Sequence, residues 1–277
     1  MKATKSILFL CAALTFAASC NKDVDMTLTQ KTLFENADIR QIAVGDAWQV
    51  TLVADSSTFV ELEYSAYLES YVKARMTGNQ LEIGFKGRVY PAINSVFRTT
   101  IHTAQLEQLE ASDAATVQCS GDFGGQGLEI DLSDASACNG LAFSGEDCIV
   151  KMENASLLTG FRFAGSRCTA TLEEASQFNG RIEADEQLEV ELEEASRFVN
   201  KGGVTAVATI KGRDGSMLNM VETRVGEMHV ELSNASEATV WVEATLDGTL
   251  KEASTLYYKG HPQIQVNCSE DSELIPL

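Results

Sequence analysis

Carboxylates return every 20 residues along this chain, which makes them the first candidates for chemistry. Glu153, Glu173 and Glu193 share one repeat position, and the next position holds Asp134, Glu174, Glu194 and Asp214. Carboxylates stacked one strand spacing apart repel each other unless a cation or a base lies between them. The columns therefore predict either an edge that binds Ca²⁺ through several oxygens or a solvated ridge that keeps an exposed sheet from pairing.

We favour the solvated ridge. The columns lack the Asp/Gly/Asn loop of calcium-binding coils. In repeat register, Arg213 would lie beside Glu193 and relieve part of the repulsion. The spacing of Cys and His residues suggests no metal site either, and we expect neither a metal nor another cofactor.

Three aromatic residues near the C-terminal end could contact a glycan or a protein: Trp241, Tyr257 and Tyr258. Consecutive side chains of a strand point to opposite faces, so one of the two adjacent tyrosine rings must face outward if the strand persists. Together with Glu153, Glu173 and Glu193, these aromatics are the candidate binding residues.

Catalytic chemistry finds little support. Six serines return every 20 residues, each after Ala or Gly: Ser136, Ser156, Ser176, Ser196, Ser216 and Ser236. They have neither a Gly-x-Ser-x-Gly elbow nor a column of histidines beside them, and a bend explains them fully. His102, His229 and His261 lie far apart in repeat register. We predict no catalytic residues. A polysaccharide-acting β-helix lyase or hydrolase remains the alternative, because paired carboxylates are plentiful.

The cysteines do not form a disulfide framework. Beyond Cys11 and Cys20, five remain, an odd number for an exported protein: Cys119, Cys138, Cys148, Cys168 and Cys268. Cys148 and Cys168 share a repeat position and should stack on adjacent coils, where they could bridge. We favour two small buried residues in one column.

The elements that position these residues follow from the same period. Relative to the serine, positions −8, −6 and −4 are mostly apolar and the positions between them polar, which predicts a strand with one face inward. Position +2 is apolar again, after a sharp bend. We therefore predict an all-β fold, a single-stranded parallel β-helix of about 20 residues per coil over residues 105–266, with strands and a β cap over 38–104 and a tail over 267–277. The glycine-rich stretch 120–127 should protrude as a loop.

The N-terminus predicts export. Lys2 and Lys5 precede an apolar run that is too short to span a membrane, and residues 1–20 are typical of a lipoprotein signal peptide. Ala17-Ala18-Ser19-Cys20 is similar to a bacterial lipobox, with Cys20 as the lipidated residue and residues 21–37 as a tether. Without the signal the chain keeps 19 basic and 40 acidic residues, a net charge of −21. Such a charge argues against nucleic acid, so we expect membrane attachment through the lipid alone.

The order of these segments resembles a known family. An opening strand, Ile39 to Val44, precedes a second from Gln49 to Asp55, Leu81-Glu82-Ile83 follows a Gly-Asn turn, and Leu-x-x-Ala-Ser corners then repeat. This layout is similar to the auto-transporter adhesin, head GIN domain family from about residue 38 to 260. The resemblance implies an exported β-helical protein, in many members a lipoprotein, and it implies no catalytic residue.

We therefore expect a non-catalytic outer-membrane lipoprotein, periplasmic or surface-exposed, whose adhesin-like solenoid binds a glycan or a protein. Besides the enzyme, one alternative is structural. If the coil near Leu256 to Val266 lacks a cap, solenoids could stack end to end.

Overall fold

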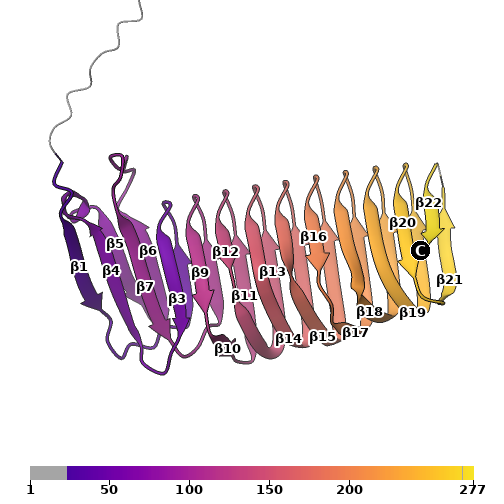
Figure 1. Cartoon of the computed structure of the whole chain (residues 1–277), viewed down its shortest axis with the longest axis horizontal. Coiled ribbons are helices and arrows are strands. Elements are labelled where there is room, and N and C mark those ends of the chain that lie inside the picture. Colours follow the sequence, from indigo (N-terminus) through magenta and orange to yellow (C-terminus); the bar gives the residue numbers. More distant parts are fainter. Residues whose placement is uncertain (1–23, 270) are drawn as a thin grey trace, which may run out of the picture.

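The computed structural model describes residues 24–269 and 271–277. The predicted signal peptide and lipidation site, residues 1–20 with Cys20, lie outside the described residues. The chain forms an elongated rod of stacked coils, so the predicted parallel β-solenoid is confirmed (Figure 1).

Each coil has two long faces joined by a tight corner on one side and a gentler bend on the other. From the N-terminal end, face 1 consists of β5 (Val72–Thr77), β6 (Gln80–Phe85), β2 (Gln41–Val44), β8 (Gln108–Ala111), β11 (Gly127–Leu132), the C-terminal parts of β13 (Ala142–Met152), β14 (Leu157–Leu172) and β15 (Gln177–Leu192), β17 (Val204–Gly212), the C-terminal parts of β18 (Met217–Leu232) and β19 (Glu237–Leu250), and β21 (Gln263–Cys268).

Face 2 follows the same order on the other side of the rod. It consists of β1 (Leu28–Leu33), β4 (Phe59–Ser65), β7 (Phe97–Thr103), β3 (Gln49–Ala54), β9 (Thr116–Ser120), β12 (Ala137–Asn139), the first residues of β14 and β15, β16 (Arg197–Asn200), the first residues of β18 and β19, β20 (Thr255–Lys259) and β22 (Glu273–Pro276). A single 3₁₀ turn, η1 (Ala66–Leu68), links β4 to β5.

The repeated Ala-Ser phrase forms the tight corner. At the corner Ser133–Ser136, Asp134 and Ala135 both have positive φ (51° and 60°), and Ser136 donates its N–H to the carbonyl of Ser133. This is the type I′ turn, which small and Asx residues tolerate best. Successive corners are also bonded to each other, since the N–H of Ala135 reaches the carbonyl of Asn154 at 2.8 Å. The count of 20 is therefore kept by a hydrogen-bonded ladder of turns.

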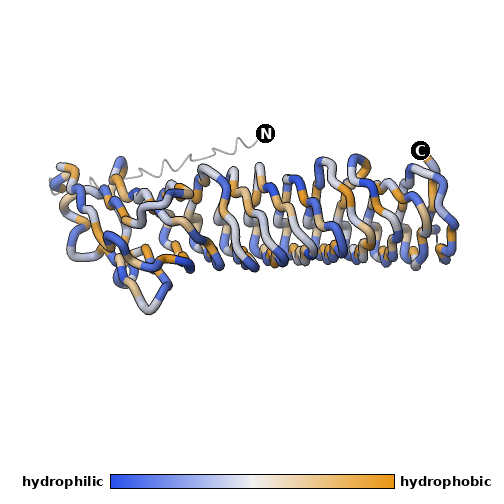
Figure 2. Tube along the Cα trace, turned by 90° about the horizontal axis from the view of Figure 1, so that it is seen from below, coloured by the Kyte–Doolittle hydropathy of each residue, from blue (hydrophilic) through white to orange (hydrophobic). Residues whose placement is uncertain are grey.

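The inner columns form one continuous core. Along the rungs, hydrophobic and hydrophilic residues alternate (Figure 2), as strands with one buried face require. Phe178 and Phe198 stack at 4.5 Å between ring centroids, and Phe161 meets Phe178 edge-on at 5.9 Å. The corner serines are buried in the same interior, and the hydroxyls of Ser156 and Ser176 lie 3.3 Å apart. Their role in this structure is that of corner residues, as predicted.

The N-terminal third differs from the expected separate cap. The coil made by β2 and β3 lies between the coil of β6 and β7 and the coil of β8 and β9, and it pairs in parallel with both. Along the chain, β2 and β3 therefore form a coil first. The later strands β6 and β7 stack on its N-terminal side, and β8 and β9 then stack on its other side. Among the described residues at this end, β1, β4 and β5 have antiparallel partners and no parallel one, so they are the cap proper.

Three smaller expectations also change. The segment 21–37 is not only a tether, because β1 lies within it and pairs with β4. The tail 267–277 contains β22, which extends face 2 beyond β20. The glycine-rich stretch contains β10 (Asp122–Gly124), which pairs with β13 on the bend side and buries Phe123. In each case main-chain pairing with an available edge outweighs the local loop signal.

Candidate functional site

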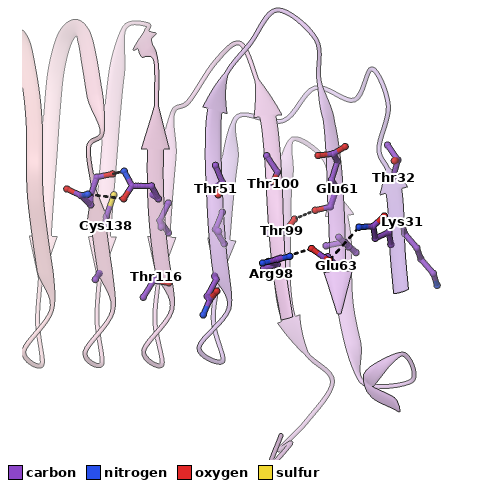
Figure 3. A pocket seen from close by; sticks show the side chains of 18 of the residues that line it. Lys31, Thr32, Thr51, Glu61, Glu63, Arg98, Thr99, Thr100, Thr116 and Cys138 are labelled. Atoms are coloured by element: carbon purple, nitrogen blue, oxygen red, sulfur yellow. Dashed lines mark hydrogen bonds and ion pairs between the residues drawn. The ribbon is translucent and has the colours of Figure 1, made fainter. Parts of the chain in front are cut away.

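A shallow groove runs along the N-terminal half of face 2. Its volume is about 770 Å³, and its walls come from β1, β4, β7, β3, β9, β12 and the start of β14 (Figure 3). These strands are neighbours across the sheet although they come from distant parts of the sequence. The groove therefore exists only because the N-terminal coils join the ladder out of chain order.

One row of outward side chains forms the floor of the groove. In-register pairing places these residues on successive strands: Glu61, Thr100, Thr51, Gln118, Asn139 and Thr159. The last three are linked, since Asn139 Nδ2 donates to Gln118 Oε1 at 2.8 Å and Thr159 Oγ1 donates to Asn139 Oδ1 at 3.0 Å. The row presents amides and hydroxyls held at one strand spacing.

A second row, two residues away on each strand, runs parallel to the first. Its members are Glu63, Arg98, Gln49, Thr116, Ala137 and Leu157. Arg98 Nε lies 2.5 Å from Glu63 Oε2, and this hydrogen bond with the guanidinium lowers the pKa of the Glu63 carboxyl (Figure 3). Leu157 is 38% exposed and offers apolar surface at the far end.

Charge is confined to the N-terminal end of the groove. Of the residues that line it, Lys31, Arg98, Glu61 and Glu63 carry charge, and these charges balance. In the spatial order of the strands, the lining is uncharged from β3 through β9 and β12 to the start of β14. On a chain as acidic as this one, the groove is a neutral polar surface that can offer both donors and acceptors.

The predicted acidic columns lie elsewhere, on the corner side next to face 1. Glu153 and Glu173 are exposed there, and Glu193 is half-buried and paired with Arg213, as the repeat register predicts. Partial burial, followed by the neighbouring Glu193 and Glu153, raises the pKa of the Glu173 carboxyl. Within residues 24–269 and 271–277, no three His, Cys, Asp or Glu side chains are grouped so as to hold a metal ion.

A second hollow of about 460 Å³ opens on face 1 near the N-terminal end, and Glu153 is part of its wall. Glu110 also lines this hollow. Burial and the carboxylates of Asp131 and Glu129 raise the pKa of Glu110. The acidic candidates are therefore split between this hollow and the corner ridge, and they do not converge on one site.

The aromatic candidates lie at the C-terminal end, far along the rod from the groove. Trp241 is half-buried between two cations, with Lys259 Nζ 3.7 Å and Arg224 Cζ 5.0 Å from its ring centroid. Tyr258 packs against the core, whereas Tyr257 extends the floor row of face 2 beyond Thr239. The structure brings Trp241 near this strand but does not unite these rings with the groove.

The cysteines of the interior are free thiols. Cys148 and Cys168 are buried on adjacent rungs, and the neighbouring thiol of Cys168, together with burial, raises the pKa of the Cys148 thiol. A second pair, Cys119 and Cys138, has its sulfur atoms 3.8 Å apart. These residues belong to the core columns.

Sequence reasoning did not single out the groove residues. A signal for part of the floor was present, because Asn139, Thr159, Asn179, Asn219 and Thr239 share the third position after the serine. The remaining floor residues, Glu61, Thr100, Thr51 and Gln118, join this column only through the rearranged N-terminal coils.

Comparison with known proteins agrees with the fold. The family described as "Putative auto-transporter adhesin, head GIN domain" matches residues 38–262. A crystal structure of a "putative adhesin" from Parabacteroides merdae is similar over 92% of this chain and 98% of that chain, with 15% identity and a TM-score of 0.68.

Two structures from Parabacteroides distasonis are also similar. One is called a "putative adhesin" (16% identity, TM-score 0.59, covering 91% of this chain and 98% of that chain), and the other a "putative lipid binding protein" (13% identity, TM-score 0.61, covering 90% and 96%). No curated protein matches the chain. At these identities the structural likeness establishes the fold.

Proposed function

This chain belongs to the auto-transporter adhesin, head GIN domain family, and from that premise we propose that it is a non-catalytic, lipid-anchored cell-envelope protein that binds a neutral glycan in the groove of face 2. The observation that carries the proposal is the uncharged floor row, Thr51, Gln118, Asn139 and Thr159, with its linked amides and hydroxyls. A polar surface built by backbone ladders is rigid before any ligand arrives, which reduces the entropic cost of binding.

Glycan chemistry fits this surface. A sugar presents hydroxyls that both donate and accept, and the side-chain amides of Gln118 and Asn139 do the same. Ala137 and the exposed part of Leu157 offer apolar contact beside them. An acidic glycan would meet the long-range repulsion of a chain with a net charge of −19, whereas a neutral glycan would not.

The binding experiment compares two asparagines of one row. Purified full chain in detergent is applied to an array of neutral glucans, mannans and galactans, with alginate and heparin as acidic probes. We expect binding to neutral glycans that changes little between low and high salt. Asn139→Ala should weaken it about fivefold, the effect of about one lost hydrogen bond.

Asn219→Ala is the matched control, because Asn219 lies in the same row but beyond the groove. It should bind as the wild type does. Equal loss in both variants, or binding of acidic glycans alone, would contradict the proposed site.

The lipid anchor rests on the sequence around Cys20. Within the described residues, no helix has the length and apolarity needed to cross a membrane. Cys20→Ala should abolish incorporation of labelled fatty acid and release the protein from the outer-membrane fraction. Retention in that fraction without acylation would refute this part of the proposal. Exposure at the cell surface is tested separately, by protease accessibility on intact cells.

A second candidate function comes from two carboxylates in the groove. Glu61 and Glu63 point to the same side of β4, and strand geometry places their Cα atoms about 7 Å apart. Inverting glycosidases use a pair of carboxyl groups at a similar separation. The hydrogen bond with Arg98 lowers the pKa of Glu63, which keeps its carboxyl ionised, as a base requires, but also makes it a weaker base. Release of reducing ends from the bound glycan, lost in Glu63→Gln, would favour a hydrolase over a binding protein. We expect none.

A further inference from the structure

The last rung that the structure describes leaves part of the core uncovered. Ile264 of β21 is 42% exposed and Leu274 of β22 is half-buried, although both side chains face the interior of the stack. On the preceding rung the corresponding inner residues Leu246, Leu250 and Leu256 are fully buried. The last described rung therefore presents apolar side chains that a further rung would cover.

The outer edge of β21 likewise has no hydrogen-bonded neighbour among the described strands. Ser269 donates its N–H to the carbonyl of Leu250, so the alternate residues of β21 bond toward β19. By the alternation of a parallel strand, the N–H and C=O groups of Ile264, Val266 and Cys268 point away from the rod. None of the described residues pairs with this edge. It is a ready template for another strand.

The other terminal edges of the rod carry features that discourage pairing. β22 contains Pro276, which has no N–H, and begins with Glu273. At the opposite end, β1 contains Lys31 and β5 contains Lys73 and Arg75. Charged residues and proline are the usual protection of edge strands. β21, with the sequence Gln-Ile-Gln-Val-Asn-Cys, has neither.

We propose that the C-terminal end of the rod docks against the same end of a second copy, with the two β21 strands antiparallel. A two-fold axis brings the open edge onto itself, so every unpaired group meets its equivalent. β21 itself is uncharged, so the pairing strands add no repulsion of their own between two chains of net charge −19. The N-terminal end, with its charged antiparallel strands, offers no matching edge, which disfavours head-to-tail filaments.

The pairing is tested by the oligomeric state of the purified full chain in detergent, measured by light scattering over a hundredfold range of concentration. We expect a dimer that dissociates on dilution. Ile264→Lys should raise the dimer dissociation constant at least tenfold. Val207→Lys is the matched control, since Val207 is 40% exposed but lies on face 1 away from the end. It should dimerise as the wild type does, which also controls for association of lipid anchors in the micelle.

Val266→Pro provides a second variant. It removes an N–H that faces the open edge and so should block pairing while leaving the bonds to β19 intact. Circular dichroism confirms that each variant is folded. A monomer at all concentrations, a dimer insensitive to both β21 variants, or growth into filaments would each overturn the proposal.

Discussion

The two faces of the rod share one core and one register but differ in what they present to solvent. Face 1 carries carboxylates on many rungs, joined across rungs by ion pairs such as Lys151–Glu129 at 2.6 Å and Arg167–Asp147 at 2.8 Å. The groove of face 2 carries an uncharged row of threonines and amides. Because exposed ion pairs contribute little to stability, the ion pairs of face 1 are not what holds the fold together.

The difference shows that a solenoid assigns stability and surface properties to different residues. Inward residues are constrained by stacking on the rungs above and below, so they repeat on both faces. Outward residues are free to vary, and in this chain one face collects charge while the other stays neutral over the groove. Each of the following changes tests that separation.

The largest expected effect lies in the shared core. Phe178→Ala removes a ring that stacks on Phe198 and should lower the free energy of unfolding by about 3–5 kcal/mol. Asn179→Ala, the next residue along but outward-facing, should change it by less than about 0.5 kcal/mol. Chemical denaturation measures both. Similar values for the two variants would refute the assignment of inward and outward positions.

A smaller loss is expected at the corner that joins the faces. Ala195 has φ 61°, a conformation in which a β-branched side chain is strained. Ala195→Val should cost about 1–2 kcal/mol. Ala164→Val, at an exposed strand position without positive φ, is the control and should be near neutral. If both variants are neutral, the type I′ corners do not hold the register.

Neutralising one acid on the ridge should stabilise the protein. Glu173 is flanked by Glu153 and Glu193, so Glu173→Gln should raise the free energy of unfolding at neutral pH by a few tenths of a kcal/mol, an effect that salt diminishes. Asn179→Asp adds one negative charge to face 2 instead. The row neighbours of Asn179 are uncharged, so the effect of this variant on the free energy of unfolding should not depend on salt. A destabilising Glu173→Gln would mean that a bound cation uses the ridge.

The smallest effect concerns pH. The hydrogen bond to Asp247 raises the pKa of His229 above its ordinary value of 6.5. Its contribution to stability is therefore complete below pH 6.5 and is lost as pH rises through the folded-state pKa. The raised pKa of Glu173 has the same sign, because the folded state binds the proton more tightly, but it acts at lower pH, as pH falls toward the carboxyl range above 4.5.

We thus expect the melting temperature to rise slightly as pH falls from about 8 to 6, and less so in His229→Gln. A melting temperature that falls over this range, or an unchanged profile in His229→Gln, would contradict this assignment.

Much of the rod was predictable because the corner serines from Ser136 to Ser236 mark the regular coils at a constant count of 20. Register fixes the inward columns, so Phe178, Phe198 and the cysteine column of Cys148 and Cys168 follow from the sequence. The position of Arg213 beside Glu193 follows in the same way.

The N-terminal order was not predictable from the period. Pairing of β2 with β8 joins residues more than 60 positions apart, and local alternation does not indicate on which side of β2 a later strand will lie. The groove depends on this order, so its residues stayed unrecognised. The aromatics near Trp241 drew attention by residue type, although cations cover that ring.

A crystal structure of the chain with the neutral glycan that binds most tightly on the array tests the central claim most directly. The account predicts sugar hydroxyls bonded to Gln118 and Asn139 in the groove of face 2. Sugar bound along the carboxylates of face 1, or beside Trp241 with the groove empty, would contradict it.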